Sequence, residues 1–123
     1  MPAAMELGCH LLFDGVSEHL LSSLEVHTFL SECPKRIGLT IFSGPHVYPT
    51  KNGLAGIVLI AQSHVSVHTN GLEVFGDTFS CLQFDSRVVI DLARELLCLE
   101  NSPKAVVRVL QRGWATLPGA KIP

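Results

Sequence analysis

Apolar residues along the chain form short runs separated by turn residues. Such runs, bounded by Gly, Pro, Asn or Asp, are typical of β-strands. One junction, Asn70-Gly71, is a strong hairpin-turn signal between two of them. The predicted strands are Leu7–Phe13, Leu39–Phe42, Gly56–Ala61, Val65–His68, Leu72–Phe75, Thr78–Leu82 and Ala105–Leu110.

Two stretches have helical spacing instead. In the first, Ser17 is the expected N-cap and Pro34 is expected to end the helix. In the second, Asp85-Ser86 caps a helix whose apolar residues share one face. A Gly- and Pro-bearing loop is predicted from Ser43 to Gly53. The apolar face of the second helix comprises Val89, Leu92, Ala93, Leu96 and Leu97.

The order that we expect is β-α-β-β-β-α-β, within a single domain that spans residues 1–123. Adjacent strands favour antiparallel pairing, so the predicted class is α+β: a two-layer α/β sandwich with a mainly antiparallel sheet and two helices on one face. The opposite face would then need a cover, and we expect a homodimer to supply it.

Composition excludes several classes of protein. The formal net charge is −2 and the nine Lys and Arg residues are scattered, so nucleic acid is not an expected partner. No segment has the length of a membrane span, and the first residues lack the features of a signal peptide, so we expect a cytoplasmic protein. His46, His64, His68 and Cys81 match no standard zinc spacing, and no metal is expected.

The segment around Ser63 carries the candidate chemistry. An apolar run ends in Gln62-Ser63 and resumes as a strand that reaches His68. A chain that cleaves itself before a serine needs the hydroxyl to attack the preceding carbonyl and a base to remove the serine α-proton. The product would be an N-terminal pyruvoyl group, whose ketone binds a substrate amine as a Schiff base during decarboxylation.

His68 is the predicted base for this processing, because imidazole titrates near neutral pH. Cys81 is the predicted proton donor to the substrate carbanion. In an unbroken strand Ser63 would share a face with Val65 and Val67, and His68 would lie on the other face. We therefore expect a bend or bulge at Ser63 that lets His68 reach it.

These residues resemble a known family. Gln62-Ser63-His64-Val65-Ser66-Val67-His68-Thr69 is similar to the Glu-Ser-His-x-x-Ile-His-Thr signature of the small prokaryotic S-adenosylmethionine decarboxylases, which are pyruvoyl enzymes. Further matches run in order along the chain. They are Leu7-Gly8-Cys9-His10-Leu11 with Leu-Gly-x-His-Leu, Gly53-Leu54-Ala55-Gly56 with Gly-x-Ser-Gly, Asp77-Thr78-Phe79-Ser80-Cys81 with Asp-x-Phe-Thr-Cys, and Arg112-Gly113 with Arg-Gly.

The resemblance implies that Ser63 is the pyruvoyl precursor and that the Gln62–Ser63 bond is cleaved. It also implies that His68 assists processing and that Cys81 donates a proton. The family is at least dimeric and serves polyamine biosynthesis, so the same is expected of this chain. Ala55 stands where the family has a serine that assists processing. Asn70-Gly71-Leu72 replaces a Trp-Pro-Glu that helps hold the adenosyl group, which leaves Tyr48 and Glu73 as substitute substrate contacts.

Other functions stay open at this stage. The missing Trp-Pro-Glu is compatible with decarboxylation of another cationic amino acid, such as arginine or ornithine. Ala55 is compatible with a homologue that stays uncleaved and acts as a binding or regulatory subunit. Taken singly, Ser63 is also compatible with an ordinary strand end, His68 with a structural histidine and Cys81 with an inert buried thiol.

Overall fold

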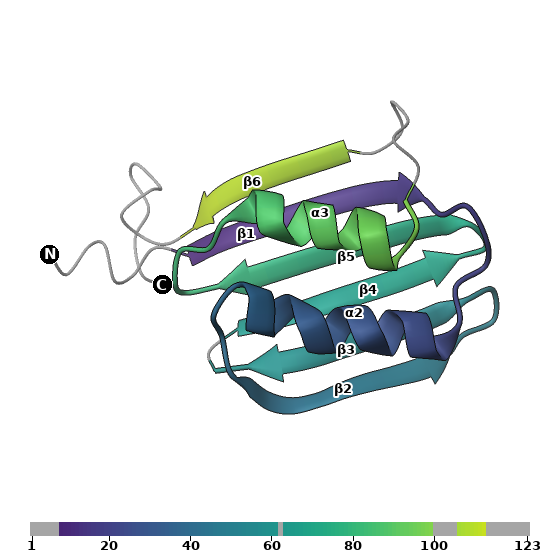
Figure 1. Ribbon diagram of the computed structural model, residues 1–123, viewed down its shortest axis with the longest axis horizontal. Helices are drawn as coiled ribbons and strands as arrows, with labels where there is room; N and C mark the ends of the chain where they lie inside the picture. The colour runs from purple at the N-terminus through teal and green to yellow at the C-terminus, as the bar shows by residue number, and fades with distance from the viewer. Residues whose placement is uncertain (1–7, 62, 100–105, 113–123) are drawn as a thin grey trace, which may run out of the picture.

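A computed structural model describes residues 8–61, 63–99 and 106–112 of the chain. The predicted strand residues Leu7 and Ala105 lie outside this range. The elements of the described part, coloured along the chain in Figure 1, are β1 (Gly8–Val16), α2 (Ser23–Arg36), β2 (Ile41–Pro49), β3 (Leu54–Ile60), β4 (Ser63–Asn70), β5 (Glu73–Ser80), α3 (Ser86–Leu96) and β6 (Val106–Arg112).

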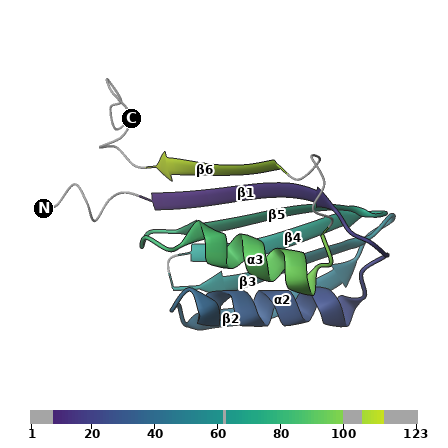
Figure 2. The same cartoon turned by 45° about the horizontal axis from the view of Figure 1, so that its top comes forward.

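The strands form one antiparallel sheet in the order β2-β3-β4-β5-β1-β6. Both helices cover the same face of this sheet, as the two views in Figures 1 and 2 show. The predicted α+β architecture is therefore confirmed. Within the described ranges, neither helix has the length and hydrophobicity of a bilayer span.

The core lies between the sheet and the helices. Strand side chains alternate between the two faces, so Val65 and Val67 of β4 are fully buried beneath the helices. From α2, Phe29 and Leu30 pack against them within the same core, and α3 contributes Val89, Leu92 and Ala93. The other face of the sheet has no helix among the described elements, and we refer to it as the open face.

A glycine in β5 makes room for the largest core ring. Gly76 pairs with Phe13 of β1, and a Cβ atom at position 76 would overlap the Phe13 ring. The absence of that Cβ lets the ring lie over β5, where it contacts Phe29 of α2 edge to face at a centroid distance of 6.3 Å. This contact ties the centre of the sheet to α2.

The first helix differs from its predicted limits. Its N-cap is Ser22, not Ser17, and Ser22 and Glu25 form a reciprocal capping box. Ser17 is buried and bridges to Leu99. Pro34 does not end the helix, which continues to Arg36, because the φ angle of proline suits a helix and its ring is buried in the core. The second helix begins after Asp85, as predicted.

The strand count also differs. The predicted order β-α-β-β-β-α-β has three strands between the helices and the predicted strand segments number five there, whereas the structure has four strands. The runs Leu72–Phe75 and Thr78–Leu82 belong to one strand, β5, because Gly76-Asp77 stays in register with both neighbouring strands. The predicted loop Ser43–Gly53 is mostly strand β2, whose polar sequence reflects its position at the edge of the sheet.

Candidate active site

The open face carries a cavity of about 280 Å³ over strands β2 to β5. It combines apolar, imidazole, hydroxyl and carboxylate groups, which is the mixture expected of a small-molecule site. It is lined by Tyr48, Ala55, Gly56, Ile57, His64, Ser66, His68 and Asp77.

Four cross-strand neighbours form a row on the open face, and three of them, Tyr48, Ala55 and His68, line the cavity. Tyr48 pairs with Ala55, Ala55 pairs with His68, and His68 pairs with Phe75. His68 is exposed, as is Tyr48, at 59%. His68, the predicted base for processing, therefore lies beside Ala55. Tyr48, one of the two predicted substrate contacts, lies one strand further away.

Ser63 and Cys81 meet at the other end of β4. Ser63 is the first residue of that strand, follows a turn at Ala61, and is half-buried. Its Oγ accepts a hydrogen bond of 3.2 Å from the backbone N–H of Cys81. Gln62, on the other side of the predicted cleavage, lies outside the described residues. The fold thus brings a predicted nucleophile next to the backbone of a predicted proton donor.

The expected bend between Ser63 and His68 is absent. Strand β4 pairs with β3 from Ser63 to His68 without a register shift. Five residues of extended strand at about 3.3–3.4 Å each separate them by roughly 17 Å. They also alternate onto opposite faces, so His68 does not reach Ser63 within the chain. The antiparallel pairing of β3 with β4 accounts for this, since the ladder stays in register up to Ser63.

Glu73, the second predicted substrate contact, is not part of the cavity lining. It begins β5 and pairs with Asn70, at the end of β4 farthest from Ser63. Its side chain is exposed. Of the two substitute substrate contacts, the structure brings only Tyr48 to the cavity.

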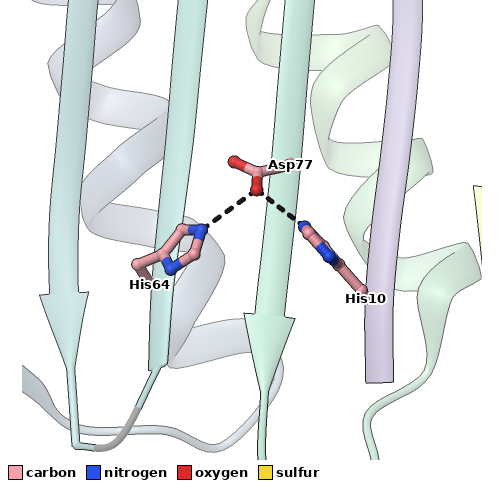
Figure 3. A group of neighbouring side chains, drawn as sticks. All are labelled: His10, His64 and Asp77. Atoms are coloured by element: carbon pink, nitrogen blue, oxygen red, sulfur yellow. Dashed lines mark hydrogen bonds and ion pairs between the residues drawn. The ribbon is translucent and has the colours of Figure 1, made fainter. Parts of the chain in front are cut away.

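Three polar residues that the sequence reasoning left without a role, His10, His64 and Asp77, meet on the open face. Nε2 of His10 lies 2.8 Å and Nε2 of His64 lies 3.0 Å from Oδ2 of Asp77 (Figure 3). Ser66 donates its hydroxyl proton to Oδ1 of the same carboxylate. His10 and Asp77 are separated by most of the chain, so spacing could not reveal the cluster. The only feature of the sequence that pointed to His10 and Asp77 was that each belongs to one of the motifs matched to the family.

This network keeps the carboxylate ionised. Burial alone would raise the pKa of Asp77, but hydrogen bonds from Ser66, His10 and His64 and the charge of His64 outweigh it and lower that pKa. Asp77 is therefore an anion at neutral pH.

The four cysteines lie in different environments. Burial raises the pKa of the Cys33 thiol to about 12 and also raises that of Cys9. Both are enclosed in the protein interior, while Cys81 and Cys98 are half-buried. Cys81 is thus the more accessible thiol near Ser63, which suits its predicted role.

Comparison with known proteins agrees with the matched motifs. Residues 10–113 match the family model described as S-adenosylmethionine decarboxylase. The chain belongs to the S-adenosylmethionine decarboxylase family.

Two curated relatives are both named S-adenosylmethionine decarboxylase proenzyme. The protein from Archaeoglobus fulgidus is 37% identical over 68 residues, which are 53% of this chain and 61% of the relative. The protein from Aquifex aeolicus is 33% identical over 84 residues, which are 63% of this chain and 62% of the relative. The matched part of the chain therefore spans about three-fifths of the length of each of these family members.

The fold has a counterpart among solved structures of the family. The crystal structure of the adenosylmethionine decarboxylase from Aquifex aeolicus superposes with a TM-score of 0.71 at 25% sequence identity. The superposition covers 88% of this chain and 92% of that one. The family resemblance thus extends from short motifs to the whole sheet-and-helix arrangement.

Proposed function

We propose that the chain is a self-processing, pyruvoyl-dependent S-adenosylmethionine decarboxylase that is cleaved between Gln62 and Ser63. The observation that carries the proposal is the family match over residues 10–113. The name proenzyme, borne by both curated relatives, supports processing. The product would enter polyamine biosynthesis, and the expected location is the cytoplasm.

The position of Ser63 fits the formation of a pyruvoyl group. The side chain starts a strand immediately after a turn, so cleavage before it would leave the sheet intact. The Cys81 N–H that donates to Ser63 Oγ would stabilise negative charge on that oxygen as it attacks the Gln62 carbonyl carbon. The peptide nitrogen then leaves as the amino group of Ser63, and an ester replaces the amide.

A base must next remove the α-proton of Ser63. The ester oxygen then leaves with the Gln62 carbonyl as a carboxylate, and a double bond forms between the α- and β-carbons of residue 63. Hydrolysis of this dehydroalanine releases ammonia. The resulting ketone would bind the substrate amine and take up the electron pair that remains when carbon dioxide leaves. Cys81 would return a proton to the substrate carbon.

The distance between Ser63 and His68 favours a homodimer. Because His68 lies about five strand residues away from Ser63 and on the opposite face, the His68 that acts at the cleavage site would have to come from a second chain. The open face has the composition of an interface, since exposed large apolar side chains stand there at the residues Tyr48, Leu59, Phe75 and Leu110. We therefore propose that processing occurs between the two chains of a dimer.

Complementation tests this arrangement. Ser63→Ala and His68→Ala chains, each uncleaved when alone, are co-expressed with different tags. Processing between chains predicts cleavage of the His68→Ala chain in mixed dimers, because the Ser63→Ala partner supplies His68. Absence of cleavage in isolated mixed dimers would contradict it, provided that the native chain cleaves under the same conditions.

The substrate is proposed from the cavity and the family together. Tyr48 offers a ring for the adenine base, while Glu73 would contribute only if a bound substrate extended along β5. A related decarboxylase of arginine or ornithine is the second candidate, favoured by the loss of Trp-Pro-Glu. Carbon dioxide release from each of the three compounds, with Ser63→Ala as the blank, separates them. A clear preference for arginine or ornithine would overturn the primary proposal.

An uncleaved binding or regulatory homologue is the alternative from a different class. The observation that favours it is Ala55, which lies opposite His68 without a hydroxyl. This alternative predicts that the native chain remains whole and that S-adenosylmethionine releases no carbon dioxide. It fails as soon as spontaneous cleavage of the native chain is seen.

A further inference from the structure

We propose that His10, His64 and Asp77 bind a divalent transition-metal ion, with Zn²⁺ as the first candidate, on the open face of the sheet. His64 and Asp77 also line the cavity that contains His68, but metal binding by the three side chains requires neither cleavage before Ser63 nor decarboxylation. Its ligands would be one nitrogen from each histidine and one carboxylate oxygen, a combination that suits zinc and neighbouring transition metals.

The spacing of the ligand atoms fits a metal ion. Nε2 of His10 and Nε2 of His64 lie 2.8 and 3.0 Å from Oδ2 of Asp77. These three atoms all lie within 4.8 Å of one another. Zinc bonds of about 2.0–2.1 Å place neighbouring ligand atoms roughly 3.0–3.4 Å apart. The two nitrogen–oxygen distances are therefore within a few tenths of an ångström of the spacing in a coordination shell, and the two nitrogens lie no more than 4.8 Å apart.

The sheet holds the three side chains in place. They come from the adjacent strands β4, β5 and β1 (Figure 3). Both histidines pair with Phe79, two residues beyond Asp77. Each imidazole ring also contacts the Phe79 ring, at centroid distances of 5.5 Å for His10 and 6.1 Å for His64. Ligands on a rigid sheet with packed rings lose little freedom when an ion binds.

The surroundings supply what such a site needs beyond its ligands. Ser66 hydrogen-bonds to Oδ1 of Asp77, which orients the carboxylate and leaves Oδ2 for the ion. In the single chain the side chains of His10, Asp77 and His64 are 16%, 19% and 33% exposed, so an ion can reach them before a second chain covers the open face.

Zinc binding to the native chain tests the proposal. The purified chain is stripped with a chelator and titrated with Zn²⁺, and bound zinc is measured by elemental analysis after gel filtration. The variants His10→Gln and His64→Gln keep an N–H group that can hydrogen-bond to Asp77 but lose the imidazole nitrogen. We expect one ion per native chain and, in each variant, an affinity loss greater than the roughly 10–100-fold caused by losing an outer-shell partner.

A matched control addresses the other group of ligand-type side chains, His19, Glu25 and Cys98. Cys98→Ser should bind zinc as the native chain does. Substitution of Co²⁺ gives a readout on the native protein: nitrogen and oxygen ligands produce only ligand-field bands, whereas Cys98 would add a thiolate charge-transfer band. The proposal is overturned if the native chain binds no zinc, if the glutamine variants bind as tightly as the native chain, or if the thiolate band accompanies the bound ion.

Discussion

Ala55 lies directly opposite His68 in the β3–β4 ladder, and both side chains line the same cavity. A serine hydroxyl at position 55 would therefore stand next to the imidazole. We expect Ala55→Ser to accelerate cleavage before Ser63 by about tenfold, which corresponds to about 1.4 kcal/mol from one additional hydrogen bond in the transition state. Gel electrophoresis of samples taken during incubation measures the rate. Leu24→Ser, at an exposed position of α2 on the other side of the sheet, is the control, and an unchanged rate in Ala55→Ser would exclude this role for the position.

Cys81 makes two contributions that mutation can separate. Its backbone N–H donates to Ser63 Oγ, and its side chain is the proposed proton donor. Cys81→Ala keeps the backbone group, so we expect self-cleavage to continue while decarboxylation falls by about 10²–10⁴-fold, the usual size of a general-acid contribution. Intact mass and carbon dioxide release report the two steps. Cys98→Ala is the matched control, and native-like turnover by Cys81→Ala would rule out the thiol as donor.

The contact between Gly76 and Phe13 predicts a large stability effect from a small substitution. A methyl group at position 76 would overlap the Phe13 ring, which is itself buried against Phe29. We expect Gly76→Ala to lower the free energy of unfolding by about 1–3 kcal/mol, as overpacking usually does. Urea denaturation measures it. In Gly15→Ala the new methyl group meets only the Leu99 side chain, so the free energy of unfolding should fall less than in Gly76→Ala. A larger loss of stability in Gly15→Ala would refute the packing account.

The capping box of α2 predicts a pH effect. The backbone N–H of Ser22 and the side chain of His19 lower the pKa of Glu25 from its ordinary value of 4.5. Since the folded-state pKa lies below the unfolded one, this stabilisation is complete above pH 4.5 and is lost as the pH falls through the folded-state pKa. Glu25→Gln should flatten this part of the stability–pH curve, measured by urea unfolding.

Ser22→Ala, which removes the N-cap hydroxyl of α2, should lower the free energy of unfolding by about 1 kcal/mol at neutral pH. An unchanged free energy of unfolding would mean that the cap does not stabilise the protein.

Local sequence patterns predicted the arrangement of the sheet and helices, but not the residues at which every helix and strand begins and ends. The alternation around Val65 and Val67 correctly placed Ser63 and His68 on opposite faces of an unbroken strand. Ser17, however, was predicted as the cap although Ser22 and Glu25 have the spacing of a capping box. The cluster of His10, His64 and Asp77 could not be predicted, because antiparallel pairing of distant strands creates it. For the same reason, the separation of Ser63 from His68 became apparent only when β4 proved continuous.

Intact-mass measurement of the purified native chain tests the central claim most directly. Self-processing before Ser63 predicts two polypeptides, residues 1–62 and a fragment of residues 63–123 whose N-terminus is blocked by a pyruvoyl group. Ser63→Ala should give one full-length chain under the same conditions. A single full-length chain from the native protein, after prolonged incubation, would contradict the claim.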